Sequence, residues 1–359
     1  MLQKTEQEIM KSWRGNLDEP VVSICSIVYN QGRYVAETIE GFLAQETDFP
    51  FEILIHDDAS TDDSAEIIRE YAKKYPNIIK PILQTENQYS QGINPNHAYN
   101  YPRAKGKYIA LCEGDDYWID PLKLRKQVDF LEENPDYGLV HTDKIYYYQK
   151  DDAFTDSKTL PANQLTYYSD EVARDYKYEE IINWGCNILT LTTCFRKELL
   201  KGLPELDSSA YFRGDRLLYL HIALQSKIKY LKDKTAVYRV LENTTSRFTD
   251  PVKSLEFLYK HANLVLYFLG RHPVNPLLHQ HVFYRNMFMK FQYALATGNY
   301  DIYKTVQLHL PPNPSVKMIG AKGLYVLCKN RPFFSILSRF YKKRIYAPCL
   351  GNTSGKNED

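Results

Sequence analysis

The stretch Tyr108–Asp120, with the sequence YIALCEGDDYWID, joins an apolar run to a group of carboxylates. Residues 108–112 have the composition of a buried strand, and Glu113, Asp115 and Asp116 follow it directly. Carboxylates this close together repel one another, so they need a cation, hydrogen-bond donors or full solvation to stay ionised. The stretch is therefore either a solvated acidic turn or a site for a divalent metal ion, because hard cations prefer clustered carboxylate oxygens.

The residues before this stretch alternate between strand and helix patterns. Strands are predicted at 21–29, 51–60, 77–84 and 108–114, and amphipathic helices at 34–45 and 60–75. This alternation predicts an α/β fold with a mostly parallel central sheet and helices on both faces.

Polar side chains follow three of the predicted strands at the point where each strand ends. They are the pairs Tyr29–Asn30, Asp57–Asp58 and Asp115–Asp116. In open parallel sheets, ligands bind outside the carboxyl ends of the strands. A merely solvated turn would have no reason to share this edge with the other two pairs, so the pattern favours a binding site.

Composition narrows the class of protein. With 359 residues, the chain is expected to form one large domain and a smaller appendage. A formal net charge of +1 argues against a dedicated nucleic-acid binder. The six cysteines show no CxxC pair, the first residues lack a signal peptide, and no window has the roughly 18 apolar residues of a membrane span. We therefore expect a reduced, cytoplasmic protein.

The later part of the chain is expected to hold a long polar loop or lid at 151–180 and a late strand at 235–240. Helices are expected from 251 to about 297, with a break at 271–276. The predicted division is an N-terminal helical extension at 1–20, a main domain at 21–250 and a helical C-terminal region at 251–359. Residues 322–346 carry seven Lys or Arg residues and no acid, interleaved with apolar residues. This segment is either a helix packed on the protein with a basic outer face or an amphipathic segment on an anionic membrane. A homo-oligomer built through the C-terminal region is a further possibility.

Six motifs follow one another between residue 21 and about residue 248. They are VSICSIVYNQGRYVAETIEGFLAQ, FEILIHDDASTDDSAEII and AKGKYIALCEGDDYWIDPLKLRKQV, followed by TTCFRKELL, GDRLLYLHIALQSKIKYL and AVYRV. In this order they resemble the family 2 glycosyltransferases, inverting enzymes of the GT-A fold that use nucleotide-sugar donors. Each motif alone is weak, but their order and spacing together are specific. They cover about two thirds of the chain.

The resemblance implies roles for particular residues. The end of the first strand lines the nucleotide pocket, the second Asp of the DDxS element binds the base, usually uracil, and the DxD-type element EGDD binds ribose and a divalent cation, Mn²⁺ or Mg²⁺. Asp116 is the implied metal ligand, and Asp115 faces the ribose or the metal. The family more often has Asp at the position of Glu113, which leaves the role of Glu113 open. The implied donor-binding residues are Ser26, Tyr29, Asn30, Asp58, Asp115 and Arg239.

The implied catalytic base is Asp215, an acid at the start of a predicted helix. The alternative for Asp215 is a helix N-terminal acid that only interacts with the helix dipole. Glu180 and Asp207 are the nearest rivals as base. Ser246 and Arg247 are further candidates for diphosphate contact, whereas Leu241 stands where the family often has His.

The resulting expectation is transfer of a sugar from a UDP-sugar to a glycan or lipid-linked acceptor, in the assembly of a bacterial surface polysaccharide. The chain lacks GxGxxG and GxxxxGK[ST], which removes the dinucleotide and P-loop alternatives. The rival from another class is a non-catalytic protein that binds sugar nucleotides or glycans on the same fold. The expected location is the cytoplasm, with possible peripheral contact at the inner face of the plasma membrane.

Overall fold

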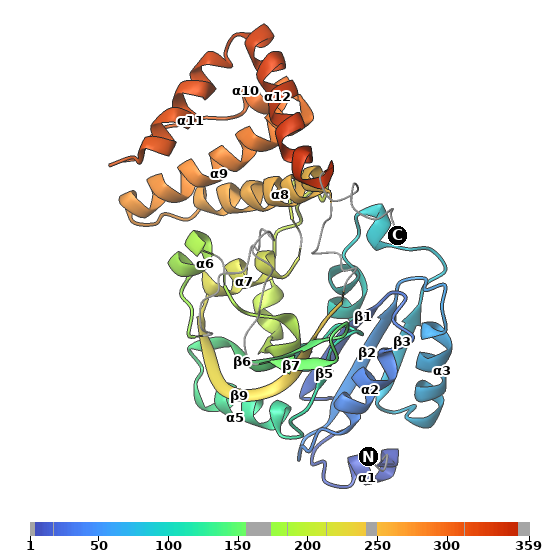
Figure 1. The fold of residues 1–359 in the computed structure, drawn as a ribbon. Helices are drawn as coiled ribbons and strands as arrows, with labels where there is room; N and C mark the ends of the chain where they lie inside the picture. The colour runs from blue at the N-terminus through green and yellow to red at the C-terminus, as the bar shows by residue number, and fades with distance from the viewer. Residues whose placement is uncertain are drawn as a thin grey trace, which may run out of the picture. The chain divides into compact units, whose positions relative to one another are not determined.

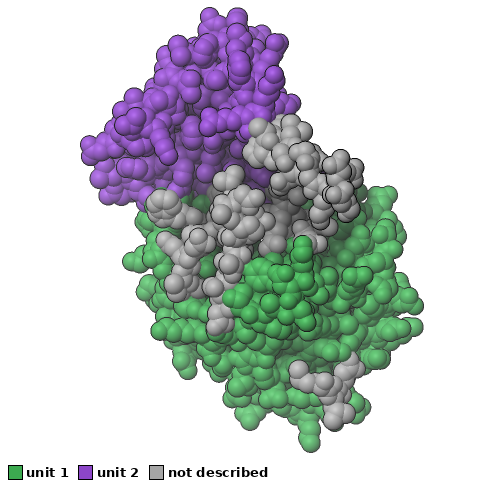
Figure 2. Space-filling view, in the orientation of Figure 1, with its two compact units in different colours: residues 1–208, 213–242 green, residues 209–212, 243–359 purple. Residues whose placement is uncertain are grey.

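The structure, a computed structural model, describes residues 4–16, 18–155, 174–184, 186–212, 214–241, 250–311 and 313–350. The chain forms two compact units, which Figure 2 shows in different colours. Unit 1 contains Met1–Ser208 and Arg213–Glu242, and unit 2 contains Ser209–Phe212 and Asn243–Asp359. The sequence predicted the boundary at 250/251, whereas this division falls after Glu242.

Unit 1 is built on one mixed sheet with the strand order β3-β2-β1-β4-β8-β6-β9-β5, and β7 pairs with β6 (Figure 1). Its strands are β1 Val22–Val28, β2 Phe51–Asp57, β3 Ile79–Leu83, β4 Tyr108–Leu111, β5 Tyr117–Trp118, β6 Tyr137–Tyr148, β7 Ala153–Thr155, β8 Thr193–Arg196 and β9 Lys227–Val240. The four strands predicted before residue 114 are all present.

The first half of the sheet is parallel, as predicted, because β1 pairs in parallel with both β2 and β4, and β2 pairs in parallel with β3. The second half departs from the expected parallel pattern. Strand β8 runs antiparallel to β4 and to β6, and β5 runs antiparallel to β9. Strand β6 pairs in parallel with β9 along most of its length, so the sheet as a whole is mostly parallel, as predicted, with antiparallel strands confined to its second half. The sheet curls at β9 (Figure 1). The antiparallel pairing of β8 and β5 joins strands that lie far apart in the sequence, so no pattern within either strand predicts it.

Helices on the two faces of this sheet follow from the alternation of side chains along each strand. Ile24, Val28 and Ile53 belong to one buried cluster that also contains the apolar stripes of α2, α3 and α5. Their equally buried neighbours Cys25 and Leu54 lie outside that cluster and therefore face the opposite side of the sheet. The helices and short turns of unit 1 are α1 Glu6–Met10, α2 Val35–Leu43, α3 Ser64–Lys74, η1 Tyr89–Gln91, η2 Asn96–Asn100, α4 Tyr101–Arg103, α5 Lys123–Glu133, α6 Tyr178–Trp184, η3 Thr190–Thr192, η4 Lys197–Leu200 and α7 Asp215–Ala223.

The N-terminal extension packs on unit 1. Helix α1 begins with a capping box between Thr5 and Glu8. The Trp13 ring meets the Phe51 ring edge-on at a centroid distance of 5.0 Å, so the extension covers the start of β2.

Unit 2 is helical, with α8 Pro251–Leu269, α9 Pro276–Thr297, α10 Tyr300–Lys304, α11 Val316–Leu327 and α12 Arg331–Leu350. The break predicted near 271–276 is confirmed between α8 and α9. Its core gathers apolar side chains of α9 with Tyr303, Cys328 and Phe334. The basic segment 322–346 is two helices rather than one, because α11 ends at Leu327 and α12 starts at Arg331. No helix among the described residues is long and apolar enough to cross a membrane.

Candidate active site

The ends of three parallel strands form the edge on which the predicted site residues lie. Val28 of β1 stands beside Asp57 of β2 in the sheet register, and the backbone N–H of Asp58 donates to the Val28 carbonyl at 2.9 Å. On the other side of β1, Cys25 stands beside Leu111 of β4. The backbone N–H of Gly114 also donates to the carbonyl of Ile27, at 3.0 Å. The three polar pairs predicted from the sequence therefore follow adjacent strands.

The acidic turn after β4 is held by the side chain of Thr38, which bonds its backbone carbonyls. The hydroxyl oxygen of Thr38 lies 3.0 Å from the carbonyl oxygen of Gly114 and 2.6 Å from that of Asp116. A Cβ atom at Gly114 would come within 2.6 Å of the Gln31 Oε1 atom and 2.7 Å of a Val28 methyl group, so the turn has room only for glycine at this position.

Asp116 is the most enclosed of the three acids. Its side chain is buried, and its Oδ1 atom accepts a hydrogen bond from the backbone N–H of Arg239 at 2.7 Å. Asp115 and Glu113 are only partly buried. The Thr190 hydroxyl donates to the Glu113 carboxylate. The turn thus directs Asp116 toward β9 and leaves Asp115 and Glu113 more accessible.

Burial and mutual repulsion disfavour the charged forms of these acids. Burial, followed by the charge of Asp115, raises the pKa of Asp116 well above its usual value. Burial also raises the pKa of Asp115. Burial raises the pKa of Glu113 to about 7, although the bond from Thr190 opposes the shift. A divalent cation at this turn would stabilise the ionised carboxylates and lower these pKa values.

The donor set fits a metal ion shared with a substrate. Across the described part of the chain, no three His, Cys, Asp or Glu side chains are arranged as a complete metal site. Mg²⁺ is commonly held by one or two carboxylates, with substrate phosphates and water completing its coordination. Asp115 and Asp116 supply that number of carboxylates.

Arg239 was predicted to contact the diphosphate, and the structure places its guanidinium among protein groups. The side chain is buried, and Nε donates to the carbonyl of Asp115 at 2.9 Å. The remaining nitrogens bond Glu37 and Gln149. Three tyrosine rings, those of Tyr34, Tyr117 and Tyr147, lie 4.7 to 5.6 Å from the guanidinium carbon. These three hydrogen bonds use three of the five N–H donors of the guanidinium group.

The predicted nucleotide residues are buried or partly engaged. The carboxylate of Asp58 is buried and accepts hydrogen bonds from the backbone N–H groups of Gln88 and Tyr89 at 2.8 and 3.0 Å. The Asn30 side chain accepts a bond from the Thr61 N–H at 2.8 Å, in a turn where Asn30 has a φ of 53°.

Two residues near the end of β1 have side chains that form no hydrogen bond with the described residues. The buried Ser26 Oγ has no hydrogen-bond partner among the described residues. Tyr29 is exposed beside this rim. Ser26 and Tyr29 therefore offer a hydroxyl and a ring to a ligand.

Asp215 begins α7, and its Oδ1 accepts a bond from the following N–H of Arg216 at 2.8 Å. Its negative charge is one cause of the raised pKa of Glu113 and of Tyr101. The start of α7 therefore lies within electrostatic reach of the acidic turn.

Of the rivals for the role of base, Glu180 accepts a bond from the backbone N–H of Lys177 and pairs with Arg174 at 3.3 Å. Asp207 is exposed in a loop. Ser246, Arg247 and most of the expected loop 151–180 lie outside the described residues, whereas β7 and α6 occupy its two ends.

Sequence reasoning missed the residues that support the turn, which are Thr38, Gln31, Glu37 and Thr190. Gln31 bonds the Asp115 carboxylate and opposes the rise of its pKa. Thr38 could have been noticed, since it is a polar residue on the buried face of α2. Thr190 and Glu37 carry no such signal.

The fold is one that solved glycosyltransferase structures share. The structure of Staphylococcus aureus TarS (residues 1–349, in complex with UDP-GlcNAc) covers 94% of this chain, and 93% of that chain is matched, with a TM-score of 0.55 and 17% identity. The mannosyltransferase PcManGT of Pyrobaculum calidifontis, in complex with GDP-Man and Mn²⁺, covers 96% of this chain and 90% of its own, with a TM-score of 0.50 and 16% identity. The class is therefore an α/β protein of the GT-A-like fold with a helical C-terminal region.

Within that class, residues 23–198 match the family model described as Glycosyl transferase family 2. An uncharacterized protein of Mycobacterium tuberculosis, Rv1520, is 46% identical over 221 residues, which are 61% of this chain and 58% of that protein. The chain thus spans less than two thirds of the length of this curated relative. The Escherichia coli UDP-Glc:alpha-D-GlcNAc-diphosphoundecaprenol beta-1,3-glucosyltransferase WfaP is 28% identical over 199 residues, 53% of this chain and 67% of WfaP.

Proposed function

We propose that the chain is an inverting, metal-dependent glycosyltransferase that transfers a sugar from a UDP-sugar to a glycan or lipid-linked acceptor. The observation that carries this proposal is that the acidic turn 113–116 and the ends of β1 and β2 lie side by side on one edge of the sheet. The charge of Asp215 contributes to the raised pKa of Glu113 in this turn. The family 2 match over residues 23–198 and the name of WfaP support the choice of reaction.

The proposed donor site lies along the ends of β1, β2 and β4. Asp58 and Ser26 offer polar atoms to the base and ribose, and the exposed ring of Tyr29 offers a stacking surface. TarS is named in complex with UDP-GlcNAc, and PcManGT with GDP-Man and Mn²⁺. Those complexes support a nucleotide-sugar donor, and UDP is our choice because WfaP is named for UDP-Glc.

Asp115 and Asp116 are the proposed metal ligands. A divalent cation bound there would neutralise charge on the departing nucleoside diphosphate. The chain's own part is to keep these carboxylates in place through Thr38, Gln31 and Arg239.

Asp215 is the proposed general base. In one displacement, the acceptor oxygen forms a bond to the anomeric carbon and its proton passes to the Asp215 carboxylate. The bond between the anomeric carbon and the phosphate oxygen breaks, and its electron pair leaves with the nucleoside diphosphate. A single displacement inverts the anomeric centre, and general base catalysis contributes roughly 10²–10⁴-fold.

The proposed setting is surface polysaccharide assembly at the cytoplasmic side of the membrane, where a lipid-linked acceptor is available. The alternative is a protein that binds sugar nucleotides or glycans without transferring them. Donor binding and donor hydrolysis would separate the two.

The test uses UDP-glucose, UDP-N-acetylglucosamine, UDP-galactose and GDP-mannose, each with Mn²⁺, Mg²⁺ or EDTA. Metal-dependent binding of one UDP-sugar with slow hydrolysis is expected. Binding without any turnover, even with lipid-linked acceptors, would favour the non-catalytic alternative. If no nucleotide sugar binds under any condition, both ideas about this site are wrong.

A further inference from the structure

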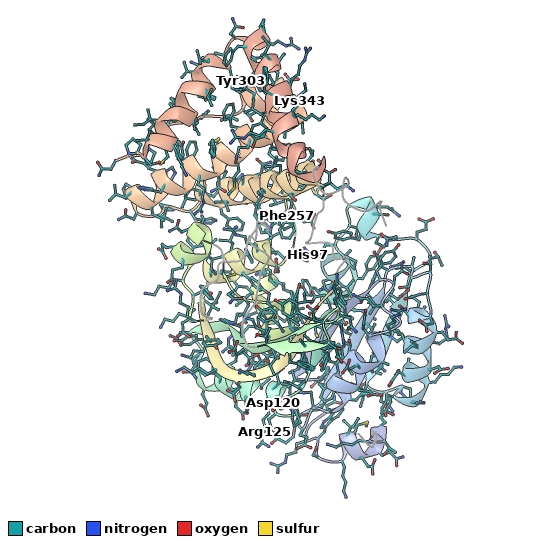
Figure 3. All side chains as sticks on the ribbon, in the orientation of Figure 1. His97, Asp120, Arg125, Phe257, Tyr303 and Lys343 are labelled. Carbon is teal, nitrogen blue, oxygen red and sulfur yellow. The ribbon has the colours of Figure 1, made fainter. Side chains whose placement is uncertain are left out.

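The outer face of α12 combines apolar and basic side chains. Ile336 and Phe340 are four residues apart on the helix, so they lie on the same face, and they are 53% and 67% exposed. Arg339 and Lys343 share this face and are also exposed. The opposite face, with Phe334 and Ser338, is buried in unit 2. Figure 3 labels Lys343 on α12 and Tyr303 in the core of the same unit.

The outer face of α11 is apolar. Val316 and Ile319 are 86% and 53% exposed, and Leu324, Val326 and Leu327 are exposed as well. Ala321 is the buried residue of this helix, so α11 rests on the unit by one narrow edge. Water-exposed aliphatic side chains in such number mark an interaction surface.

The same part of the chain is strongly basic. Between Ile302 and Leu350 there are nine Lys or Arg residues and no Asp or Glu, although the whole chain has a net charge of only +1. Lys304 pairs with Asp301, and Lys322 donates to the carbonyl of Leu308. Arg339, Lys342 and Lys343 are exposed and form no ion pair within the described residues. Their charge is available to a partner.

These features identify the occupant of the surface by its chemistry. The occupant must cover aliphatic side chains and carry negative charge beside them. A second copy of this chain would present the same basic helices and be repelled. A bilayer containing anionic lipids offers both properties at one interface, and no described helix is suited to cross it.

We propose that the outer faces of α11 and α12 dock unit 2 on an anionic membrane surface, with Phe340, Ile336, Val316 and Ile319 entering the headgroup region and Arg339, Lys342 and Lys343 contacting lipid phosphates. This surface does not depend on the proposed transfer reaction, since its test reads binding in the absence of any sugar nucleotide. Failure of one proposal therefore leaves the other standing.

The test is flotation of the full chain with phosphatidylcholine vesicles that contain or lack phosphatidylglycerol. Binding is expected only with phosphatidylglycerol and should fall as salt is raised. Arg339→Glu/Lys343→Glu should weaken binding by at least about tenfold. Ile336→Ser/Phe340→Ser should weaken vesicle binding by a similar factor, because two apolar side chains that would enter the headgroup region are lost.

Two matched variants in unit 1 serve as controls. Phe154→Ser removes a side chain that is 60% exposed, and Lys232→Glu reverses an exposed charge. Both should bind vesicles like the wild type, and circular dichroism should show that all four variants fold. Equal binding to neutral and anionic vesicles, or equal loss in the controls, would overturn the proposal. The proposal would also be overturned if the wild-type chain bound no vesicles but self-associated, and if Ile336→Ser/Phe340→Ser abolished that self-association.

Discussion

The backbone N–H of Arg239 donates to Oδ1 of Asp116 at 2.7 Å. Strand β9 therefore holds the Asp116 carboxylate in the turn after β4. The Arg239 side chain holds the same turn through the carbonyl of Asp115. One residue of β9 therefore fixes both proposed metal ligands, and the stability of the fold and the geometry of the site depend on it together.

Replacing Asp116 separates its structural role from its proposed metal role. Asp116→Ala would leave the buried Arg239 N–H without an acceptor and should lower the free energy of unfolding by about 1–3 kcal/mol. Asp116→Asn keeps an oxygen acceptor and should fold normally, yet lose metal-dependent binding of the UDP-sugar. Urea unfolding and calorimetric titration measure the two effects. Normal binding by Asp116→Asn would assign the cation to Asp115 alone.

Arg239→Lys should damage the site although it keeps the charge. Lysine lacks the planar group that bonds Asp115, Glu37 and Gln149 at once. We expect a lower melting temperature and a weaker affinity for the metal–donor complex. The control is Lys232→Arg, an exposed position on the same strand. Arg239→Lys could instead keep wild-type stability and lose only affinity for the diphosphate. That result would support the direct phosphate contact predicted for Arg239 from the sequence.

The raised pKa of Glu113 predicts how stability varies with pH. Burial raises the pKa of this carboxyl from 4.5 to about 7, so the folded state binds the proton more tightly than the unfolded state. This contribution is complete below pH 4.5 and is lost as pH rises through about 7. The glutamine of Glu113→Gln cannot ionise. Between pH 4.5 and about 7, the free energy of unfolding of this variant should therefore fall less than that of the wild type, by up to about 3 kcal/mol. Urea unfolding with EDTA at several pH values measures the difference.

Glu133→Gln, at an exposed position on α5, provides the control for that series. It should follow the wild-type curve. Parallel curves for Glu113→Gln and wild type would mean that the carboxyl of Glu113 is ionised in the folded protein throughout the range.

Asp215→Asn should abolish transfer and spare donor binding. The amide cannot accept the acceptor proton, so kcat should fall by roughly 10²–10⁴-fold. Helix α7 should remain, because the amide oxygen can still accept the Arg216 N–H. Asp207→Asn and Glu180→Gln are the comparisons. Loss of turnover in either of these, with an active Asp215→Asn, would move the role of base to that residue.

The local parts of the fold could be predicted from the sequence, whereas its long-range pairings could not. Apolar runs ending in polar turns predicted β1, β2 and β4, and helical spacing predicted α8 and α9. Strand β9 was expected only at 235–240 but starts at Lys227, because its first half is rich in charge and has a partner in β6 rather than an apolar pattern of its own.

The candidate site shows the same limit. The acids of the turn were visible because they are adjacent in sequence. The environment of Arg239 was not, since its partner Glu37 is 202 positions away and a charged residue in a strand gives no sign that it is buried. Thr38 and Thr190 likewise act across 78 and 77 positions.

The bond between Arg239 and Asp116 spans 123 positions of the chain. On the ribosome, the acidic turn emerges long before the strand that completes it, so a nascent chain ending with the family 2 match at residue 198 has the carboxylates without their brace. Contacts of such sequence separation form late in folding. The acidic turn therefore reaches the geometry described here only after β9 has been made, and a chain that stops short of β9 lacks the bond that holds Asp116.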